Sequence, residues 1–246
     1  MLDVLSWVGG WPTVVGSSWR EWPHGWEKQL ALIMNKTGIN AVILELAVAH
    51  DPENSMLSVI ELDQPKWGIG TRWPYLMGID DLTVQNYTSL MIQTAEFLGA
   101  DHETAVRDMK EAVDLEVRLV NFSAEINLTE YIHAVFDDFV HLTPNDTIII
   151  REPEYFRGIQ HIMKTVSKRV LANYLSWRIV QGLSTFLPPL AREPFYQFKA
   201  NHTGVFNAPP PDRWEDCVTL SVILMDMPVG KLFVEHFFER TKALEK

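Results

Sequence analysis

One long helical pattern constrains the fold of this chain more than any other feature. From Lys168 to Phe186, apolar residues recur at helical spacing and then extend around most of the helix: Val170, Leu171, Tyr174, Leu175, Trp177, Ile179 and Val180. An apolar surface this wide requires burial on more than one side. We therefore expect a helix, capped by Ser167, that runs through the middle of a bundle. Trp177 should lie in the core, with Arg178 on the narrow polar side, nearer solvent or a carboxylate.

The remaining sequence predicts more helices and little sheet. Helical periodicity predicts five further helices, over residues 26–36, 82–98, 101–120, 129–141 and 153–165. A short helix broken at Pro194 and two closing helices after Asp212 should follow. Two β-like runs, NAVILELAVA and MLSVIELDQP, flank the turn sequence HDPENS and predict a β-hairpin near residues 40–64. With one further short strand at residues 147–151, the strands are too few for a doubly wound sheet, so the predicted fold is mainly α.

The first 26 residues hold a cluster of tryptophans among Gly, Ser and Pro, which indicates irregular, tightly packed chain. Clustered indoles can bind sugars, but a packed core or an interface is their commoner use. The five residues are Trp7, Trp11, Trp19, Trp22 and Trp26.

Charge and hydropathy exclude two classes of protein. The formal net charge of −11 argues against nucleic-acid binding, which needs a basic surface. The longest apolar runs fall short of the roughly 18–20 residues that span a bilayer. The N-terminus, MLDVLSWVGG, has no basic flank and does not resemble a signal peptide.

The asparagines nevertheless indicate a secretory protein. Of ten asparagines, six begin N-x-[ST] triplets, whereas chance predicts about one. They are candidate glycosylation sites: Asn35, Asn86, Asn121, Asn127, Asn145 and Asn201. A secreted protein with the single cysteine Cys217 implies a disulfide partner outside this chain. The simplest explanation is an internal fragment of a longer protein, and the alternative is a cytosolic protein with a buried thiol.

One helix face has the spacing of a metal site. His133, Asp137 and His141 recur every four residues, and imidazole and carboxylate groups so placed can bind a metal ion. The opposite face is apolar, so the same residues also fit the solvated side of an amphipathic helix. We favour the second interpretation.

Other candidate catalytic groups are incomplete. His236 and Glu239 are spaced like a ligand pair, and His102-Glu103 lacks a second histidine four residues later. The chain contains no H-E-x-x-H, G-x-S-x-G or P-loop motif, and the acidic context of Cys217 disfavours a nucleophilic thiol. From local chemistry we predict no catalytic, cofactor-binding or metal site in this chain.

Seven stretches carry a family resemblance. They are GGWP (9–12), IELDQP (60–65), GIGTR (68–72), EPEYFRGI (152–159), NYLSWRIV (173–180), RWEDC (213–217) and PVGKLFVEHFF (228–238). In this order and approximate spacing they resemble the N-terminal half of the neprilysin and endothelin-converting-enzyme family of zinc endopeptidases.

The resemblance implies a fold, a compartment and a function. It implies a helical capping domain over residues 1–207 that walls the peptide chamber. Residues 208–246, which include the proline-rich linker 208–211, would lead to a catalytic domain that holds zinc and is missing here. The family consists of glycosylated, disulfide-bonded ectodomains that are membrane-anchored or secreted, and its R-W-x-x-C cysteine, here Cys217, pairs with a cysteine upstream of the matched region. This chain alone should be inactive.

The sequence also departs from the family. A cysteine pair that some members carry near residues 75–85 is absent, and about twenty residues between Val120 and EINLTEYI are missing. The chain also stops where the family continues. Two non-enzymatic alternatives therefore stay open: a secreted or decoy binding module derived from this family, and a lectin-like module that uses the tryptophan cluster.

Overall fold

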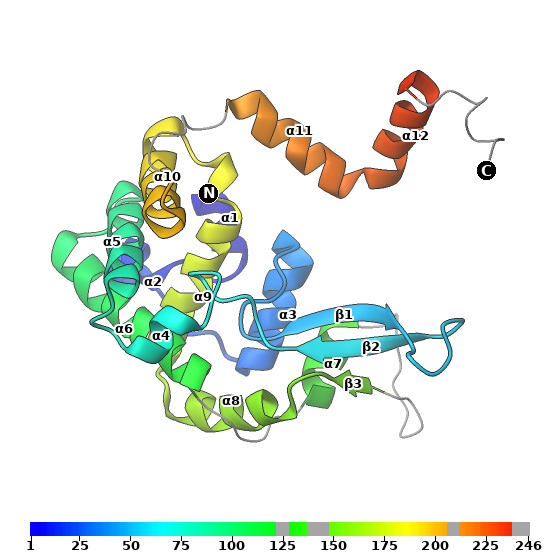
Figure 1. Ribbon diagram of the computed structural model, residues 1–246. Helices are drawn as coiled ribbons and strands as arrows, with labels where there is room; N and C mark the ends of the chain where they lie inside the picture. Colours follow the sequence, from blue (N-terminus) through cyan, green and yellow to red (C-terminus); the bar gives the residue numbers. More distant parts are fainter. Residues whose placement is uncertain (122–127, 137–147, 206–211, 238–246) are drawn as a thin grey trace.

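The computed structural model describes residues 1–121, 128–136, 148–205 and 212–237, which form mainly helices beside a small sheet (Figure 1). The predicted fold class is therefore confirmed. The helices are α1 (Leu2–Trp7), α2 (Pro12–Val15), α3 (Trp26–Thr37), α4 (Trp73–Met77), α5 (Leu82–Phe97), α6 (His102–Asn121), α7 (Leu128–Phe136), α8 (Pro153–Thr165), α9 (Lys168–Gly182), α10 (Pro189–Thr203), α11 (Arg213–Leu224) and α12 (Asp226–Phe237), with 3-10 turns at Gly16–Ser18 and Ser184–Phe186.

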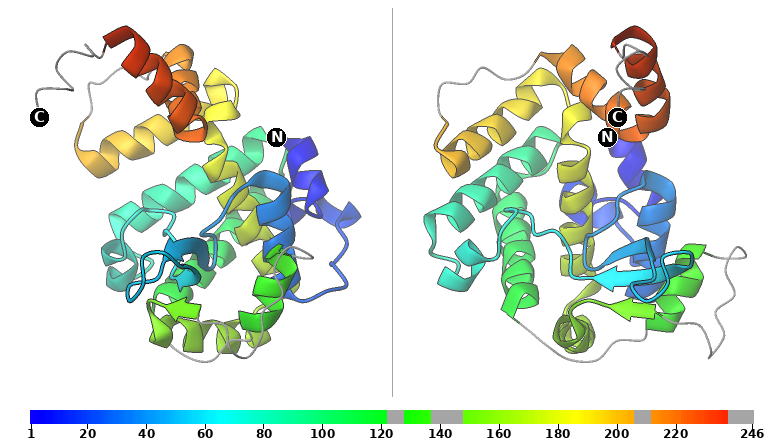
Figure 2. Two further views of the ribbon diagram at one scale, coloured as in Figure 1. Left: turned by 90° about the vertical axis from the view of Figure 1, so that its right-hand side faces the viewer. Right: turned by 45° about the vertical axis from the view of Figure 1, so that its right-hand side comes forward.

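Helix α9 occupies the centre of the bundle, as its apolar pattern predicts (Figures 1 and 2). Every residue from Leu171 to Val180 is buried except Arg178, which is half-buried. The Ser167 hydroxyl accepts a hydrogen bond from the amide of Val170 at 3.2 Å and so caps the helix. Trp177 has no exposed surface, and its indole donates to the Tyr87 hydroxyl at 2.6 Å.

The helix after Pro188 is longer than predicted. Pro194 does not break it, because α10 runs unbroken from Pro189 to Thr203. Tertiary packing explains this tolerance of a residue that costs about 3 kcal/mol in a helix interior. Phe195 stacks on Trp177 with ring centroids 5.9 Å apart, and the ring centroids of Phe198 and Tyr87 are 5.8 Å apart, so the helix directly after Pro194 is held against the core.

The predicted hairpin is present but begins later than its sequence suggests. Strands β1 (Glu45–His50) and β2 (Ser58–Asp63) pair antiparallel, with Leu46 opposite Leu62, and β3 (Ile148–Ile150) joins β2 in parallel. Residues 40–44 are not strand, because Ala41 takes a left-handed φ of 59°. Asn40 holds this turn, since its Oδ1 accepts from the amides of Ala41 and Leu46 at 2.8 and 3.2 Å.

The N-terminal segment is more regular than predicted. Residues 1–26 contain α1, α2 and a 3-10 turn, not only irregular chain. Trp11 and Trp22 are buried, in agreement with a packed cluster, whereas Trp7 is 55% exposed.

Helices α11 and α12 stand away from the bundle and meet at a bend of 103° (Figures 1 and 2). No residue in either helix is buried. No single described helix has the length and apolar composition to cross a bilayer, and these two pass that test only as a bent pair.

Candidate functional site

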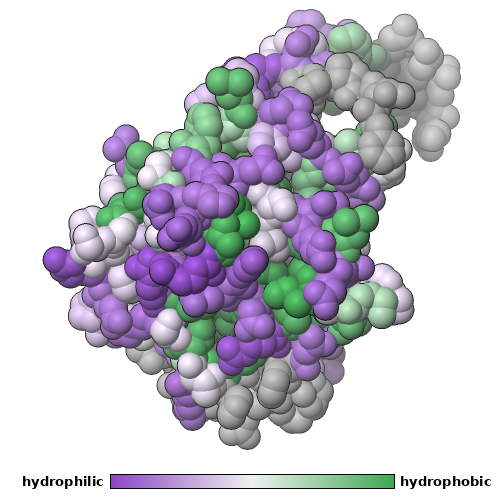
Figure 3. Space-filling view, turned by 90° about the vertical axis from the view of Figure 1, so that its left-hand side faces the viewer, coloured by the Kyte–Doolittle hydropathy of each residue, from purple (hydrophilic) through white to green (hydrophobic). Residues whose placement is uncertain are grey.

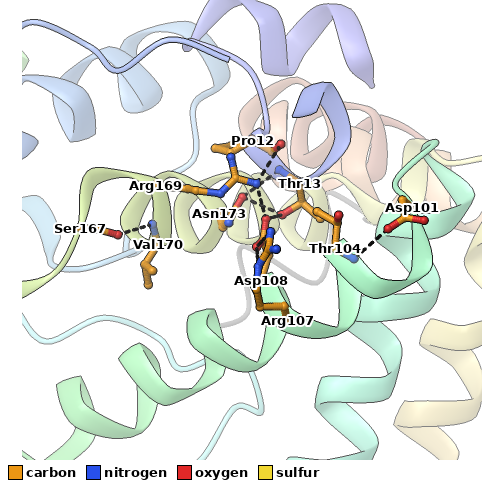
Figure 4. Close-up of polar contacts among 10 residues, drawn as sticks. All are labelled: Pro12, Thr13, Asp101, Thr104, Arg107, Asp108, Ser167, Arg169, Val170 and Asn173. Carbon is orange, nitrogen blue, oxygen red and sulfur yellow. Dashed lines mark hydrogen bonds and ion pairs between the residues drawn. The ribbon is translucent and has the colours of Figure 1, made fainter. Parts of the chain in front are cut away.

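The described residues contain two buried polar clusters, one on each half of helix α9. The first is built around Asp108 of α6, whose side chain is 1% exposed (Figure 4). Arg169 Nη2 lies 2.6 Å from its Oδ2, and Arg107 donates twice to its Oδ1, at 2.8 and 2.9 Å. Burial raises the pKa of Asp108, but the hydrogen bonds from Arg107 and Arg169 outweigh it and hold the pKa below its ordinary value.

Thr13 and Asn173 connect this Asp108 cluster to the N-terminal segment. Asn173 Oδ1 accepts from the amide of Thr13 at 3.0 Å, and the Thr13 hydroxyl lies 2.7 Å from the same oxygen and 3.0 Å from Asp108 Oδ2. Because the hydroxyl has one proton, it can donate to only one of these oxygens at a time. The cluster thus fastens α2, α6 and α9 together.

The second cluster is built around Glu116, which has no exposed surface. Its Oε1 accepts from the amide of Gly68 at 2.8 Å and lies 3.4 Å from both the Tyr174 hydroxyl and Arg178 Nη1. Arg178 also donates to the Tyr174 hydroxyl at 2.9 Å and to the carbonyl of Lys66. Burial lowers the pKa of Arg178, but Tyr174 and Glu116 outweigh it and raise the pKa above its ordinary value, so the guanidinium stays charged.

A cavity of about 330 Å³ opens beside this Glu116 cluster. Arg178 and Gln181 of α9 form one wall of the cavity. Both side chains have hydrogen-bond partners: Arg178 binds the Tyr174 hydroxyl and the carbonyl of Lys66, and Gln181 donates to the carbonyl of Gly68 at 2.7 Å. Lys66 Nζ and Glu45 Oε1 lie 3.7 Å apart in the cavity lining. These groups brace the Lys66–Gly68 loop against α9, and none of them forms a nucleophile–base pair.

The described structure contains only part of the metal candidates. Among the described residues, no group of three or more His, Cys, Asp or Glu side chains could hold a metal ion. His133 lies on α7 with a side chain outside the described part, and Asp137, His141 and Glu239 lie outside it altogether. His236 is exposed on α12, with Nδ1 2.9 Å from the carbonyl of Leu232. His102 Nδ1 contacts Glu96 at the surface.

Three of the asparagine candidates and Cys217 are exposed in the described structure. Asn35, Asn121 and Asn201 are exposed on α3, α6 and α10, Asn86 is half-buried on α5, and Asn127 and Asn145 lie outside the described residues. Cys217 is a free, exposed thiol on α11.

Neither buried cluster was predicted from the sequence. The helical pattern over residues 101–120 is one of apolar residues and did not identify Asp108 and Glu116, which are fully buried. A carboxylate within an otherwise apolar helix stripe was the signal in the sequence. Because a buried charge requires a partner, such a carboxylate predicts a buried polar cluster. The two clusters also explain two of the resembling stretches: Thr13 follows GGWP directly, and Asn173, Tyr174 and Arg178 belong to NYLSWRIV.

Comparison with known proteins gives a consistent family match. The sequence profile of peptidase family M13, for its N-terminal region, matches residues 1–125 and 121–246. Neprilysin-21 of Caenorhabditis elegans is 57% identical over 271 aligned positions, which include all of this chain and 35% of the relative. Human neprilysin is 25% identical over 97% of this chain and 37% of its own length. This chain thus spans little more than a third of the relatives it matches.

Solved structures agree on the fold. The zinc metalloprotease Zmp1 of Mycobacterium tuberculosis, in complex with an inhibitor, superposes with a TM-score of 0.74 over 98% of this chain and 38% of that protein. The sequence identity is 15%, so the likeness concerns the fold alone.

Proposed function

Because this chain belongs to peptidase family M13, we propose that it forms the helical wall of a neprilysin-like zinc metalloendopeptidase that cleaves small peptides. Residues 1–207 form the wall of the peptide chamber and limit substrate size by sterics. Residues 208–246 lead to a catalytic region that this chain does not contain. The buried Asp108 and Glu116 clusters keep the wall rigid, because they fasten α2, α6 and the Lys66–Gly68 loop to the central helix.

The observation that carries this proposal is the apolar surface of α11 and α12. A helix in water normally buries one face, yet these two have no buried residue. Their exposed apolar side chains are Trp214, Val218, Val222, Ile223, Leu224, Met227, Leu232, Phe233, Val234 and Phe237. An exposed apolar surface of this extent indicates a contact with more protein. By contrast, the opposite side of the molecule, around α5 and α6, is largely hydrophilic with small separate apolar patches (Figure 3).

One ion pair among the described residues joins α11 to the bundle. Arg192 of α10, 9% exposed, lies 2.8 Å from Asp216 of α11 and also donates to the Tyr196 hydroxyl at 3.1 Å. The pair sets the direction in which α11 leaves the bundle. It therefore positions the surface that we assign to the catalytic region.

Zinc belongs to that catalytic region in this proposal. The described His, Cys, Asp and Glu side chains do not fit a zinc ion, because no three of them form a group of potential ligands. In the complete protein, zinc would activate water for peptide hydrolysis. This chain contributes walls and contacts, and no catalytic group.

We further propose an extracellular ectodomain, either membrane-anchored or secreted. The support is the set of exposed N-x-[ST] asparagines together with an exposed thiol on α11 that is suited to a disulfide with a cysteine outside this chain. A decoy module that pairs with a full-length homologue is the second candidate, because the same α11–α12 surface would serve it.

Zinc content and peptide hydrolysis test the proposal. We expect the 246-residue chain to bind no stoichiometric zinc and to cleave no peptide, and a protein extended through the zinc motif to do both. In the extended protein, Phe233→Asp should reduce hydrolysis at least tenfold while Met56→Asp, at an 89% exposed position on the hairpin turn, leaves it unchanged. Stoichiometric zinc in the chain alone, or full activity of the Phe233→Asp variant, would contradict the proposal.

A further inference from the structure

Strand β1 has a free edge, and the backbone groups that face outward from it can be identified. In the described sheet the strand order is β1-β2-β3, so β1 has a strand on one side only. Residues of an antiparallel strand point their N–H and C=O groups alternately toward the partner strand and away from it. Leu46 points away from β2, because its C=O and N–H bind the carboxamide of Asn40 at 2.5 and 3.2 Å. By this alternation, Val48 and His50 also present their N–H and C=O groups at the free edge.

The opposite strand shows the same alternation. Leu62 of β2 lies opposite Leu46 in the register of the hairpin. Its carbonyl accepts from the amide of Arg151 at 2.9 Å, on the side of β3, and so points away from β1. Leu46 and Leu62 therefore exchange no main-chain hydrogen bond, and the same holds for every second pair along β1, which includes the pairs of Val48 and His50.

Strand β1 lacks the features that usually protect an edge strand from pairing. Its sequence, ELAVAH, contains no Lys, Arg or Pro, and its six consecutive pairs with β2 include no bulge. Ala47 and Val48 are exposed, Val48 to 62%. The Asn40 carboxamide occupies the edge only at Leu46. The edge beside Val48 and His50 can therefore accept an added strand.

We propose that this edge binds an extended segment of the peptide substrate as an added antiparallel strand. The inference deepens the proposed function and rests on it. β1 forms the edge of the sheet on the side of α11 and α12 (Figures 1 and 2), where the proposed function places the catalytic region and the peptide chamber. The main chain of the substrate exchanges hydrogen bonds with the outward N–H and C=O groups of Val48 and His50. Such contacts hold a peptide with little regard to its side chains.

The charges beside the edge favour a peptide over a second copy of this chain. The N-terminal end of an added antiparallel strand lies beside the C-terminal end of β1, near the exposed carboxylates of Asp51 and Glu53. A peptide with a positively charged N-terminal end complements them. Two copies paired about Ala49 would instead place Glu45 of one copy opposite Glu53 of the other, and like charges directly opposite each other are unfavourable.

Binding of a labelled peptide, followed by fluorescence anisotropy, tests the inference. The probe is a hexapeptide of alternating threonine and valine that begins with a free lysine and carries a fluorophore at its C-terminus. Val48→Pro should weaken its binding to the 246-residue chain roughly tenfold, because proline removes an outward N–H and leaves the bonds to β2 in place. His50→Pro should have the same effect. The matched control Val48→Thr keeps the N–H and should bind the probe like the unaltered chain. The Tm of each variant shows that it is folded.

The outcomes separate this inference from the proposed function. No binding of the probe, or equal binding to the unaltered chain and both proline variants, would overturn the inference and leave the chamber wall in place. In a protein extended through the zinc motif, slow exchange of the Val48 and His50 amides without peptide would assign the edge to the catalytic region and also overturn it. So would a dimer of the 246-residue chain that Val48→Pro converts to a monomer. An extended protein that binds no zinc and cleaves no peptide would contradict the proposed function itself, whatever the probe does.

Discussion

Arg178 of α9 lies against Glu116 of α6 in the interior of the bundle, with Nη1 3.4 Å from Oε1 and side chains that are 10% and 0% exposed. From the sequence, Arg178 is expected nearer solvent or a carboxylate, a position from which its removal should cost much less than the removal of Trp177. That expectation does not fit this geometry, because Arg178→Ala would leave the buried Glu116 side chain without its cationic partner.

We therefore expect Arg178→Ala to destabilise the chain by about 3–5 kcal/mol, as for other broken buried ion pairs. Removing both charges, in Arg178→Met with Glu116→Gln, should cost less than Arg178→Ala alone. Urea unfolding measures both values. Lys66→Ala is the control, since its pair with Glu45 is largely exposed and should contribute less than about 1 kcal/mol. A near-neutral Arg178→Ala would contradict the stabilising role assigned to the buried Arg178–Glu116 pair.

Trp177→Ala should cost roughly 3–5 kcal/mol, because it removes a fully buried indole and leaves a cavity. It also removes the hydrogen bond to Tyr87 and the stacking contact with Phe195. Trp73→Ala, at an exposed indole, should change the free energy of unfolding by less than about 0.5 kcal/mol. Equal effects of the two substitutions would place α9 outside the core and contradict the architecture.

Asp108 should make the free energy of unfolding decrease as the pH falls. Because its folded-state pKa is lowered below the unfolded value of about 3.9, its contribution is complete above that value and is lost as the pH falls through the folded pKa. Asp108→Asn should therefore cost roughly 1.5–3 kcal/mol at pH 7 and progressively less toward pH 2. Unfolding in urea across this range measures the difference. Asp114→Asn, on the exposed face of the same helix, should show no such trend.

Cys217 should react as a free thiol in this chain. It is exposed on α11, so a thiol reagent should modify one cysteine per chain without denaturant. In a protein extended upstream, the family resemblance predicts a disulfide at this residue, which would abolish the reaction and raise the Tm, since a disulfide contributes about 2–4 kcal/mol. A reactive Cys217 in the oxidised, extended protein would contradict the resemblance at this residue.

Local pattern predicted the elements better than the contacts between them. The apolar circumference of α9 and its Ser167 cap are properties of consecutive residues, so the sequence contained them. The Asp108 cluster draws Thr13 from 95 positions away and Arg169 from 61 positions away, and no local pattern encodes such a meeting. Pro194 illustrates the reverse case. A proline inside a helix favours a break, but the packing of Phe195 and Phe198 against the core outweighs this local preference.

The same distinction applies to the candidate site. The absence of a zinc motif could be concluded from the sequence alone, because H-E-x-x-H is a contiguous pattern. The exposed surface of α11 and α12 could not, since their apolar residues resemble those of any buried helix until the fold leaves them uncovered.

Amide hydrogen exchange in α11 and α12 tests the central claim most directly. The measurement compares this 246-residue chain with a protein extended through the zinc motif. If these helices bind the catalytic region, their amides should exchange at least tenfold more slowly in the extended protein, while the amides of α9 exchange slowly in both. Equal, fast exchange of α11 and α12 in the two proteins would contradict the claim that these helices join the chain to a catalytic region.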